Sequence, residues 1–148
     1  KTLILRNPNA TRPWQHVLEP LIGYLLLVEK LISKGGKKYE GPWNFGPSVK
    51  QNLKVFNLAN IIKKKMKSKS KIIVKTKFNE IKKEKIKIIE SKNLNISNKK
   101  AKIYLKWQPK LTVKNSLDLT IAWYNAYKDK KNLLDLTRNQ IKGYLKKL

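Results

Sequence analysis

A run of apolar residues between positions 18 and 32 constrains the fold of this chain more than any other feature. Its side chains recur at intervals of three and four residues, the spacing of one face of a helix: Leu18, Leu21, Leu25, Val28 and Ile32. Pro20 suits the first helical turn, where its missing N–H breaks no hydrogen bond. Gly35 and Gly36 then give a stop signal. The spacing therefore predicts a helix over about residues 19–34.

Outside this helix, short strand-like runs alternate with amphipathic segments. Extended segments are predicted at residues 2–5, 14–17, 43–47 and 71–76. Helices are predicted at residues 53–66, 98–105, 113–127 and 138–148, with Thr112 as the N-cap of the third. Residues 77–93 fit a strand, a hairpin or a lysine-rich loop, and this choice stays open. Because no long linker interrupts the pattern, we predict an α/β fold of mixed strands and helices in a single domain, residues 1–148.

The chain is strongly basic. Its 35 lysine and arginine residues outnumber 9 acidic residues, and the net charge of +26 by itself predicts a polyanionic partner. The lysines, however, are spread among isoleucine and asparagine, and arginine is scarce, although it suits base edges and phosphates better. We therefore interpret the charge as a solvated basic surface and expect no specific nucleic-acid partner.

Several kinds of chemistry have no motif in the sequence. The absence of cysteine excludes a disulfide framework and zinc–thiolate sites, and fits a cytoplasmic protein. The longest apolar stretch, residues 21–28, is too short to span a membrane, so no membrane partner is expected. His16 has no cysteine or serine at a motif spacing, and no glycine-rich turn leads from a strand into a helix. From the residues alone we reach a basic α/β domain without a predicted catalytic, metal or dinucleotide site.

The clearest resemblance to a known family lies in residues 6–25. It is carried by the runs RNP at 6–8, RPWQHVLEPL at 12–21 and GYL at 23–25. Together these runs resemble a signature of the CDP-glucose 4,6-dehydratases, members of the extended short-chain dehydrogenase/reductase superfamily. Later landmarks are similar in order and spacing: WNFGP at 43–47, Glu90, Leu94, Lys100-Ala101, Trp107, Pro109, Thr120 and Trp123-Tyr124. The chain departs from the family pattern at Ile89, Ser97 and Lys106, and over residues 63–87.

The resemblance implies a function that this chain would share with a missing portion. In the superfamily an N-terminal Rossmann half binds NAD and supplies a catalytic tyrosine–lysine pair, and neither motif occurs here. Residues 1–148 would then be the C-terminal, substrate-binding part, inactive alone. The family moves hydride from C4 of CDP-glucose, eliminates water across C5 and C6, and returns the hydride to C6, giving CDP-4-keto-6-deoxyglucose. The full enzyme would be a cytoplasmic homodimer serving deoxysugar synthesis for lipopolysaccharide O-antigen.

The resemblance also implies substrate-binding residues. Arg12 matches an arginine that holds the substrate diphosphate, and a guanidinium suits this because it contacts phosphate oxygens in pairs. Asn44 matches an asparagine that faces the nucleotide, where an amide can both donate and accept. Trp14, His16 and Glu90 are weaker candidates, for which packing, a structural histidine and a solvated carboxylate are the alternatives. The remaining large aromatic residues are predicted to be core: Trp43, Trp107, Trp123 and Tyr124.

Two other functions stay open at this stage. One is a different extended-family enzyme, such as a GDP-mannose dehydratase or a UDP-sugar epimerase. The other is a basic nucleic-acid-binding domain, whose affinity would fall steeply with salt. If the Rossmann half is missing, the surfaces that pack on it should be apolar and exposed in this chain.

Overall fold

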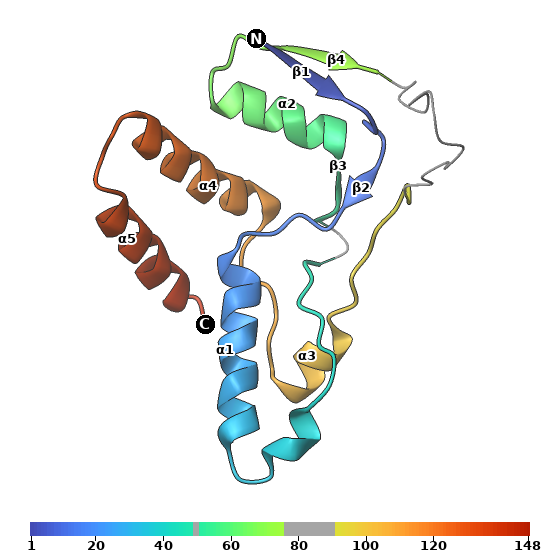
Figure 1. Ribbon diagram of the computed structural model, residues 1–148, viewed down its shortest axis with the longest axis vertical. Coiled ribbons are helices and arrows are strands. Elements are labelled where there is room, and N and C mark those ends of the chain that lie inside the picture. Colours follow the sequence, from blue (N-terminus) through green and yellow to red (C-terminus); the bar gives the residue numbers. More distant parts are fainter. Residues whose placement is uncertain (49–50, 76–90) are drawn as a thin grey trace, which may run out of the picture. The chain divides into compact units, whose positions relative to one another are not determined.

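The structure is a computed structural model that describes residues 1–48, 51–75 and 91–148 (Figure 1). These residues divide into two compact units. The strand unit comprises Lys1–Arg12 and Asn52–Leu94, and the helical unit comprises Pro13–Gln51 and Asn95–Leu148. The chain therefore passes between the units three times. The single domain over residues 1–148 stays a prediction, and each unit is described by itself below.

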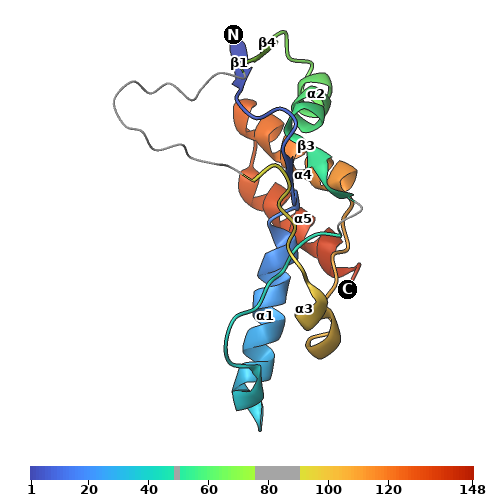
Figure 2. The same ribbon diagram turned by 90° about the vertical axis from the view of Figure 1, so that its right-hand side faces the viewer.

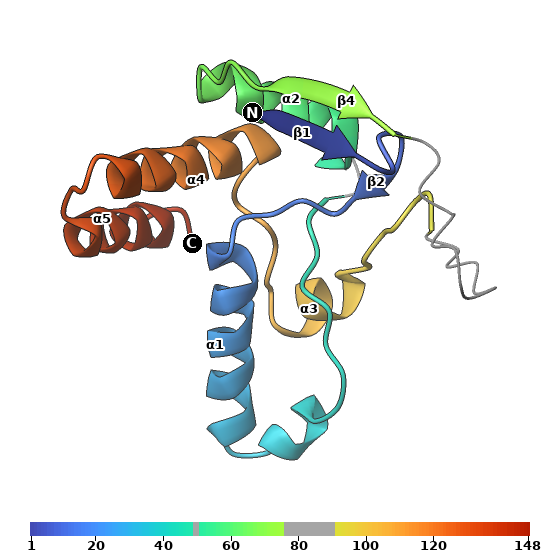
Figure 3. The ribbon, with the colours of Figure 1, turned by 45° about the horizontal axis from the view of Figure 1, so that its top comes forward.

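The strand unit is built on a parallel strand pair with a crossover helix. Strand β1 (Thr2–Leu5) pairs in parallel with β4 (Lys71–Val74), and α2 (Val55–Lys65) lies between them in sequence. Figure 3 shows α2 along one face of this pair. The short strands β2 (Thr11–Arg12) and β3 (Leu53–Lys54) form a separate antiparallel pair that leads directly into α2.

Backbone groups close both ends of α2. The first N–H groups of a helix have no partner within it. Here Val55 N–H donates to Ala10 O at 3.0 Å, and Phe56 N–H donates to Pro8 O at 3.0 Å. At the other end Lys67 takes a left-handed conformation (φ 49°), and Ser68 N–H donates back to Lys63 O at 3.0 Å. This is the usual backbone solution for ending a helix, although glycine is commoner at the left-handed position.

The helical unit contains helices and irregular segments. Its elements are α1 (Leu18–Ile32), the 3-10 helix η1 (Gly36–Tyr39), α3 (Lys99–Tyr104), α4 (Val113–Lys128) and α5 (Leu133–Leu145). Its described residues form no β-strand, so the strand predicted at residues 43–47 is wrong. That segment leads from η1 back along the helical unit, as Figures 1 and 2 show from two sides, and it inserts Phe45 into the core.

The core of the helical unit joins the irregular segment to the two helices beside it. Its buried members are Phe45, Ala101, Leu105 and Trp107. The Phe45 and Trp107 rings meet edge to face with centroids 5.1 Å apart. A Cβ at Gly23 would lie 2.3 Å from Phe45 Cδ1, so glycine is required where α1 passes this ring. Ile22, Leu26 and Leu27 of α1 complete the contact.

The apolar stripe that predicts α1 is not the face that packs on this core. We call Leu21, Leu25, Val28 and Ile32 the α1 stripe, and their exposed fractions are 44%, 64%, 51% and 81%. The adjacent face, with Gly23 and Ile22, turns inward instead. The structure thus leaves an apolar surface of α1 exposed.

Most predicted helices are confirmed within a few residues at each end. The last helix differs most, because it begins at Leu133 and not near residue 138. The Asn132 side chain accepts hydrogen bonds from Leu134 N–H and Asp135 N–H, which starts the helix one turn earlier. Thr112 is confirmed as the N-cap of α4, since its hydroxyl accepts from Asn115 N–H at 3.1 Å. Of the ambiguous segment 77–93, only residues 91–93 are described.

Candidate functional site

Asn44 lies in a hollow on the surface of the helical unit that several polar side chains line. Because Trp43 and Phe45 turn toward the core, the extended backbone directs the Asn44 side chain outward, where it is exposed. The hollow has a volume of about 410 Å³, and its other lining residues are Pro42, Ser97, Lys99, Lys100, Ile103 and Tyr104. We call it the Asn44 hollow.

One wall of the Asn44 hollow combines a cation with an aromatic platform. The Lys100 ammonium lies 4.2 Å from the centre of the Trp43 ring and donates a hydrogen bond to Pro42 O at 3.0 Å. These two contacts hold the charge at the rim. Tyr104 meets Trp43 edge to face at 6.4 Å, yet 59% of Tyr104 is exposed. Its ring is therefore available for stacking against a ligand.

A second, larger hollow adjoins the first. It has a volume of about 650 Å³, shares Ser97 and Lys99 with the Asn44 hollow, and adds the side chains of Asn95, Asn98, Lys102 and Gln108. Asn98 donates to Gly46 O at 2.9 Å, which fixes the start of α3 against the irregular segment. Amides, a hydroxyl and ammonium groups line both hollows, and this donor set suits a phosphorylated, hydroxyl-rich ligand.

Arg12 belongs to the strand unit. It pairs with Leu53 across β2 and β3, and its Nη1 donates to Thr11 O at 2.8 Å and to Ser91 O at 3.1 Å. The guanidinium thus braces two segments of its own unit. Since Arg12 and Asn44 lie in different units, their joint contact with one ligand stays a prediction.

His16 lies in a different part of the helical unit from Asn44. It is 7% exposed, and its Nδ1 accepts a hydrogen bond from Leu18 N–H at 3.3 Å, at the start of α1. Burial lowers the pKa of His16, and the Glu19 carboxylate opposes this shift in part. The histidine lines a mainly apolar hollow of about 270 Å³ between α4, α5 and the start of α1. It is absent from the residues that line the Asn44 hollow and the larger hollow beside it.

The other predicted site residues add little to the hollows. Trp14 is partly exposed and lines neither of these two hollows. Glu90 lies outside the described residues. Among the aromatic residues predicted to be core, Trp107 is buried and Trp43 packs on the core. Tyr124, however, is 56% exposed, so its prediction as core is wrong.

Glu19 is the residue that sequence analysis missed. It is 1% exposed, although it begins an apolar helix. Its Oε1 accepts from Lys110 N–H at 2.9 Å and Leu111 N–H at 2.6 Å, and its Oε2 accepts from the Tyr144 hydroxyl at 2.6 Å. Its backbone carbonyl accepts from the Trp107 indole at 3.1 Å. The sequence feature that could have identified Glu19 is an acidic residue in the first turn of an otherwise apolar helix.

The Glu19 clasp, as we call these contacts, supports one wall of the second hollow. It fixes the backbone at residues 110 and 111, directly after Gln108 and Pro109, which line that hollow. It also ties this loop to α5 through Tyr144. Burial raises the pKa of the Tyr144 hydroxyl well above its ordinary value, and the hydrogen bond to Glu19 and the carboxylate charge add to the shift. The tyrosine therefore remains a donor.

Comparison with known proteins finds a similarity to one class of enzyme. The chain is similar to a nucleotide-sugar dehydratase, and no family model matches it. The relative is the CDP-glucose 4,6-dehydratase of Salmonella typhimurium strain LT2, 28% identical over 143 residues. This similarity covers 97% of the present chain but only 37% of the relative's length. Among the described residues no cluster of three or more metal-binding side chains occurs, and no described helix could cross a membrane.

Proposed function

We propose that this chain supplies the sugar-nucleotide-binding portion of a nucleotide-sugar 4,6-dehydratase that converts CDP-glucose to CDP-4-keto-6-deoxyglucose. The observation that carries the proposal is the similarity to a CDP-glucose 4,6-dehydratase along 97% of the chain. The Asn44 hollow supports it, because its side chains fit the parts of a nucleotide diphosphate. The complete enzyme is proposed to be a cytoplasmic homodimer.

The chemistry of each side chain in the Asn44 hollow suits one part of a sugar nucleotide. The exposed ring of Tyr104 offers a face on which a base can stack. The Asn44 amide can donate to and accept from the base or the ribose. Lys99 and Lys100 supply positive charge for phosphate oxygens. In this proposal Arg12 adds the bidentate contact to the diphosphate.

The residues of this chain do not fit NAD. A dinucleotide needs a glycine-rich turn between a strand and a helix, where backbone N–H groups meet the pyrophosphate. The described glycines with positive φ, Gly35 and Gly41, instead flank the four-residue helix η1. We therefore assign NAD binding and the hydride steps to a separate portion of the enzyme. The α1 stripe, with Leu25 and Ile32 exposed by 64% and 81%, is the surface proposed to pack on it.

Replacement of Asn44 by alanine tests the proposal. We expect Asn44→Ala to weaken CDP-glucose binding about three- to tenfold, because one ligand hydrogen bond is lost. Isothermal titration calorimetry with the chain would measure this, with UDP-glucose and GDP-mannose as competitors. The matched control is Asn125→Ala, an exposed asparagine of α4 that lines neither the Asn44 hollow nor the larger hollow beside it. Equal affinities in both variants would remove Asn44 from the site, and stronger binding of UDP-glucose or GDP-mannose would change the substrate.

A further inference from the structure

The charge of the strand unit is unbalanced. Its described residues contain no aspartate or glutamate, whereas all six described carboxylates belong to the helical unit. The twelve cationic side chains of the described strand unit are Lys1, Arg6, Arg12, Lys54, Lys63, Lys64, Lys65, Lys67, Lys69, Lys71, Lys75 and Lys92. In sequence, residues 76–90 add five lysines and three glutamates, so they do not reverse the charge. An anionic partner would relieve the repulsion within this unit.

One face of the strand pair combines this charge with apolar side chains. Leu3 and Ile72 line a hollow with residues of α2, so this side of the pair faces the helix. Because side chains alternate along a strand, Ile4 and Ile73 point to the opposite side. They are register partners, and their exposed fractions are 46% and 43%.

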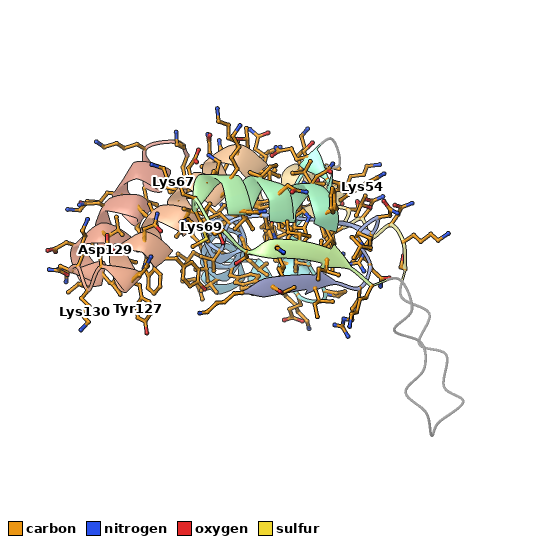
Figure 4. The ribbon with its side chains drawn as sticks, turned by 90° about the horizontal axis from the view of Figure 1, so that it is seen from above. Lys54, Lys67, Lys69, Tyr127, Asp129 and Lys130 are labelled. Carbon is orange, nitrogen blue, oxygen red and sulfur yellow. The ribbon has the colours of Figure 1, made fainter. Side chains whose placement is uncertain are left out.

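Lysines surround this apolar pair. Lys71 and Lys75 are two residues from Ile73 on either side, so they share its direction, and both are exposed. Lys67 and Lys69 lie beyond the last turn of α2, in the segment that enters β4, whereas Lys54 lies at the other end of the helix (Figure 4). We call Ile4, Ile73, Lys69, Lys71 and Lys75 the basic face.

The composition of the basic face favours a lipid surface over a nucleic acid. Lysine is a point charge that needs no defined geometry, whereas base recognition relies on arginine forks and aromatic stacking. The basic face has neither, and Phe56 is the one aromatic residue in the described strand unit. Peripheral membrane proteins combine lysines for anionic headgroups with apolar side chains that enter the interface. Ile4 and Ile73 between lysines fit that combination.

We propose that the basic face docks peripherally on an anionic phospholipid bilayer. This departs from the sequence-based expectation of no membrane partner, which concerned spanning segments, and it is independent of the proposed dehydratase function. The lysines supply attraction at the surface, and the two isoleucines supply a shallow apolar contact. The attraction acts over about 10 Å at 0.1 M salt, so the bilayer must approach this face closely.

Vesicle co-sedimentation of the chain tests the proposal. Phosphatidylcholine vesicles with and without one quarter phosphatidylglycerol are compared for the wild-type chain and for Lys69→Gln/Lys71→Gln/Lys75→Gln. We expect binding only with the anionic lipid, a steep loss with salt, and a loss on the order of a hundredfold in the variant, at about fivefold per lysine. A triple Lys→Arg variant at the same positions should bind like the wild type.

The matched control removes the same charge elsewhere. Lys142→Gln/Lys146→Gln/Lys147→Gln removes three exposed lysines in and after the last turn of α5, in the helical unit. We expect it to bind nearly as well as the wild type. An equal loss in both variants would show that only net charge matters and would overturn the proposal. Tighter binding to single-stranded DNA than to the anionic vesicles, with the same dependence on the basic face, would identify a nucleic-acid site instead. Circular dichroism melts confirm that each variant is folded.

Discussion

At the scale of single residues, Glu19 is a buried carboxylate whose two oxygens both accept hydrogen bonds. Three donors converge on its carboxylate, and two of them are backbone N–H groups of one loop. Removal of the carboxylate would leave all three donors without that acceptor in a buried site, and each such loss costs about 1–3 kcal/mol. The clasp is therefore expected to contribute far more to the free energy of unfolding than a surface ion pair does, such as that of Glu29 with Lys30 at 3.6 Å.

We expect Glu19→Ala to lower the free energy of unfolding by roughly 3 kcal/mol or more. Urea denaturation followed by tryptophan fluorescence measures this, since Trp107 donates to the Glu19 carbonyl. Glu29→Ala, on the same helix but exposed, serves as the control and should change stability by less than about 0.5 kcal/mol. Similar losses of unfolding free energy in the two variants would contradict a stabilising role for the Glu19 clasp.

His16 predicts a pH dependence of stability. Its pKa is lowered in the folded protein, so the unfolded chain binds the proton more tightly and stability falls as the pH drops below the unfolded value of 6.5. The stabilisation that the neutral His16 side chain contributes is fully present above pH 6.5. We expect His16→Gln to flatten the curve of unfolding free energy between about pH 7 and 5. An unchanged slope in urea titrations across this range would show that other groups cause it.

At the scale of elements, the sequence pattern predicts where helices lie, but it does not predict which side of each helix packs on the core. The α1 stripe has the right period for a helix, but period alone does not say which apolar face packs on the core. Gly23 decides this, because its missing Cβ admits the Phe45 ring. The segment with Phe45 is apolar like a strand, but it packs on residues of α1 and α3, and within the part of the chain that the structure describes it pairs with no strand.

Substitutions on the two faces of α1 should destabilise the protein to different extents. Gly23→Ala would place a methyl group 2.3 Å from a ring carbon of Phe45, and we expect it to cost about 1–3 kcal/mol. Leu25→Ser on the α1 stripe should cost less than about 0.5 kcal/mol in the chain alone. Thermal melts by circular dichroism compare the two. A larger loss for Leu25→Ser would mean that the stripe is covered.

At the scale of the whole molecule, the sequence predicts the class of fold and the family resemblance. It does not predict how the chain divides into two compact units. Mixed helices and strands were predictable from period and caps. The separation of Arg12 from Asn44 into different units was not, because it depends on pairings such as Thr11 with Asn93, far apart in sequence. The Glu19 contacts, which link α1 to a loop and to α5, are likewise long-range.

The three crossings between the units also limit how either unit can be produced by itself. Neither unit is one continuous stretch of chain, because each takes a piece from before and after a piece of the other. A single cut within a crossing therefore leaves the two units covalently joined through the remaining crossings. Expression of any one contiguous segment yields an incomplete version of at least one of them. Separate study of either unit requires a rewired gene in which its two pieces are spliced together.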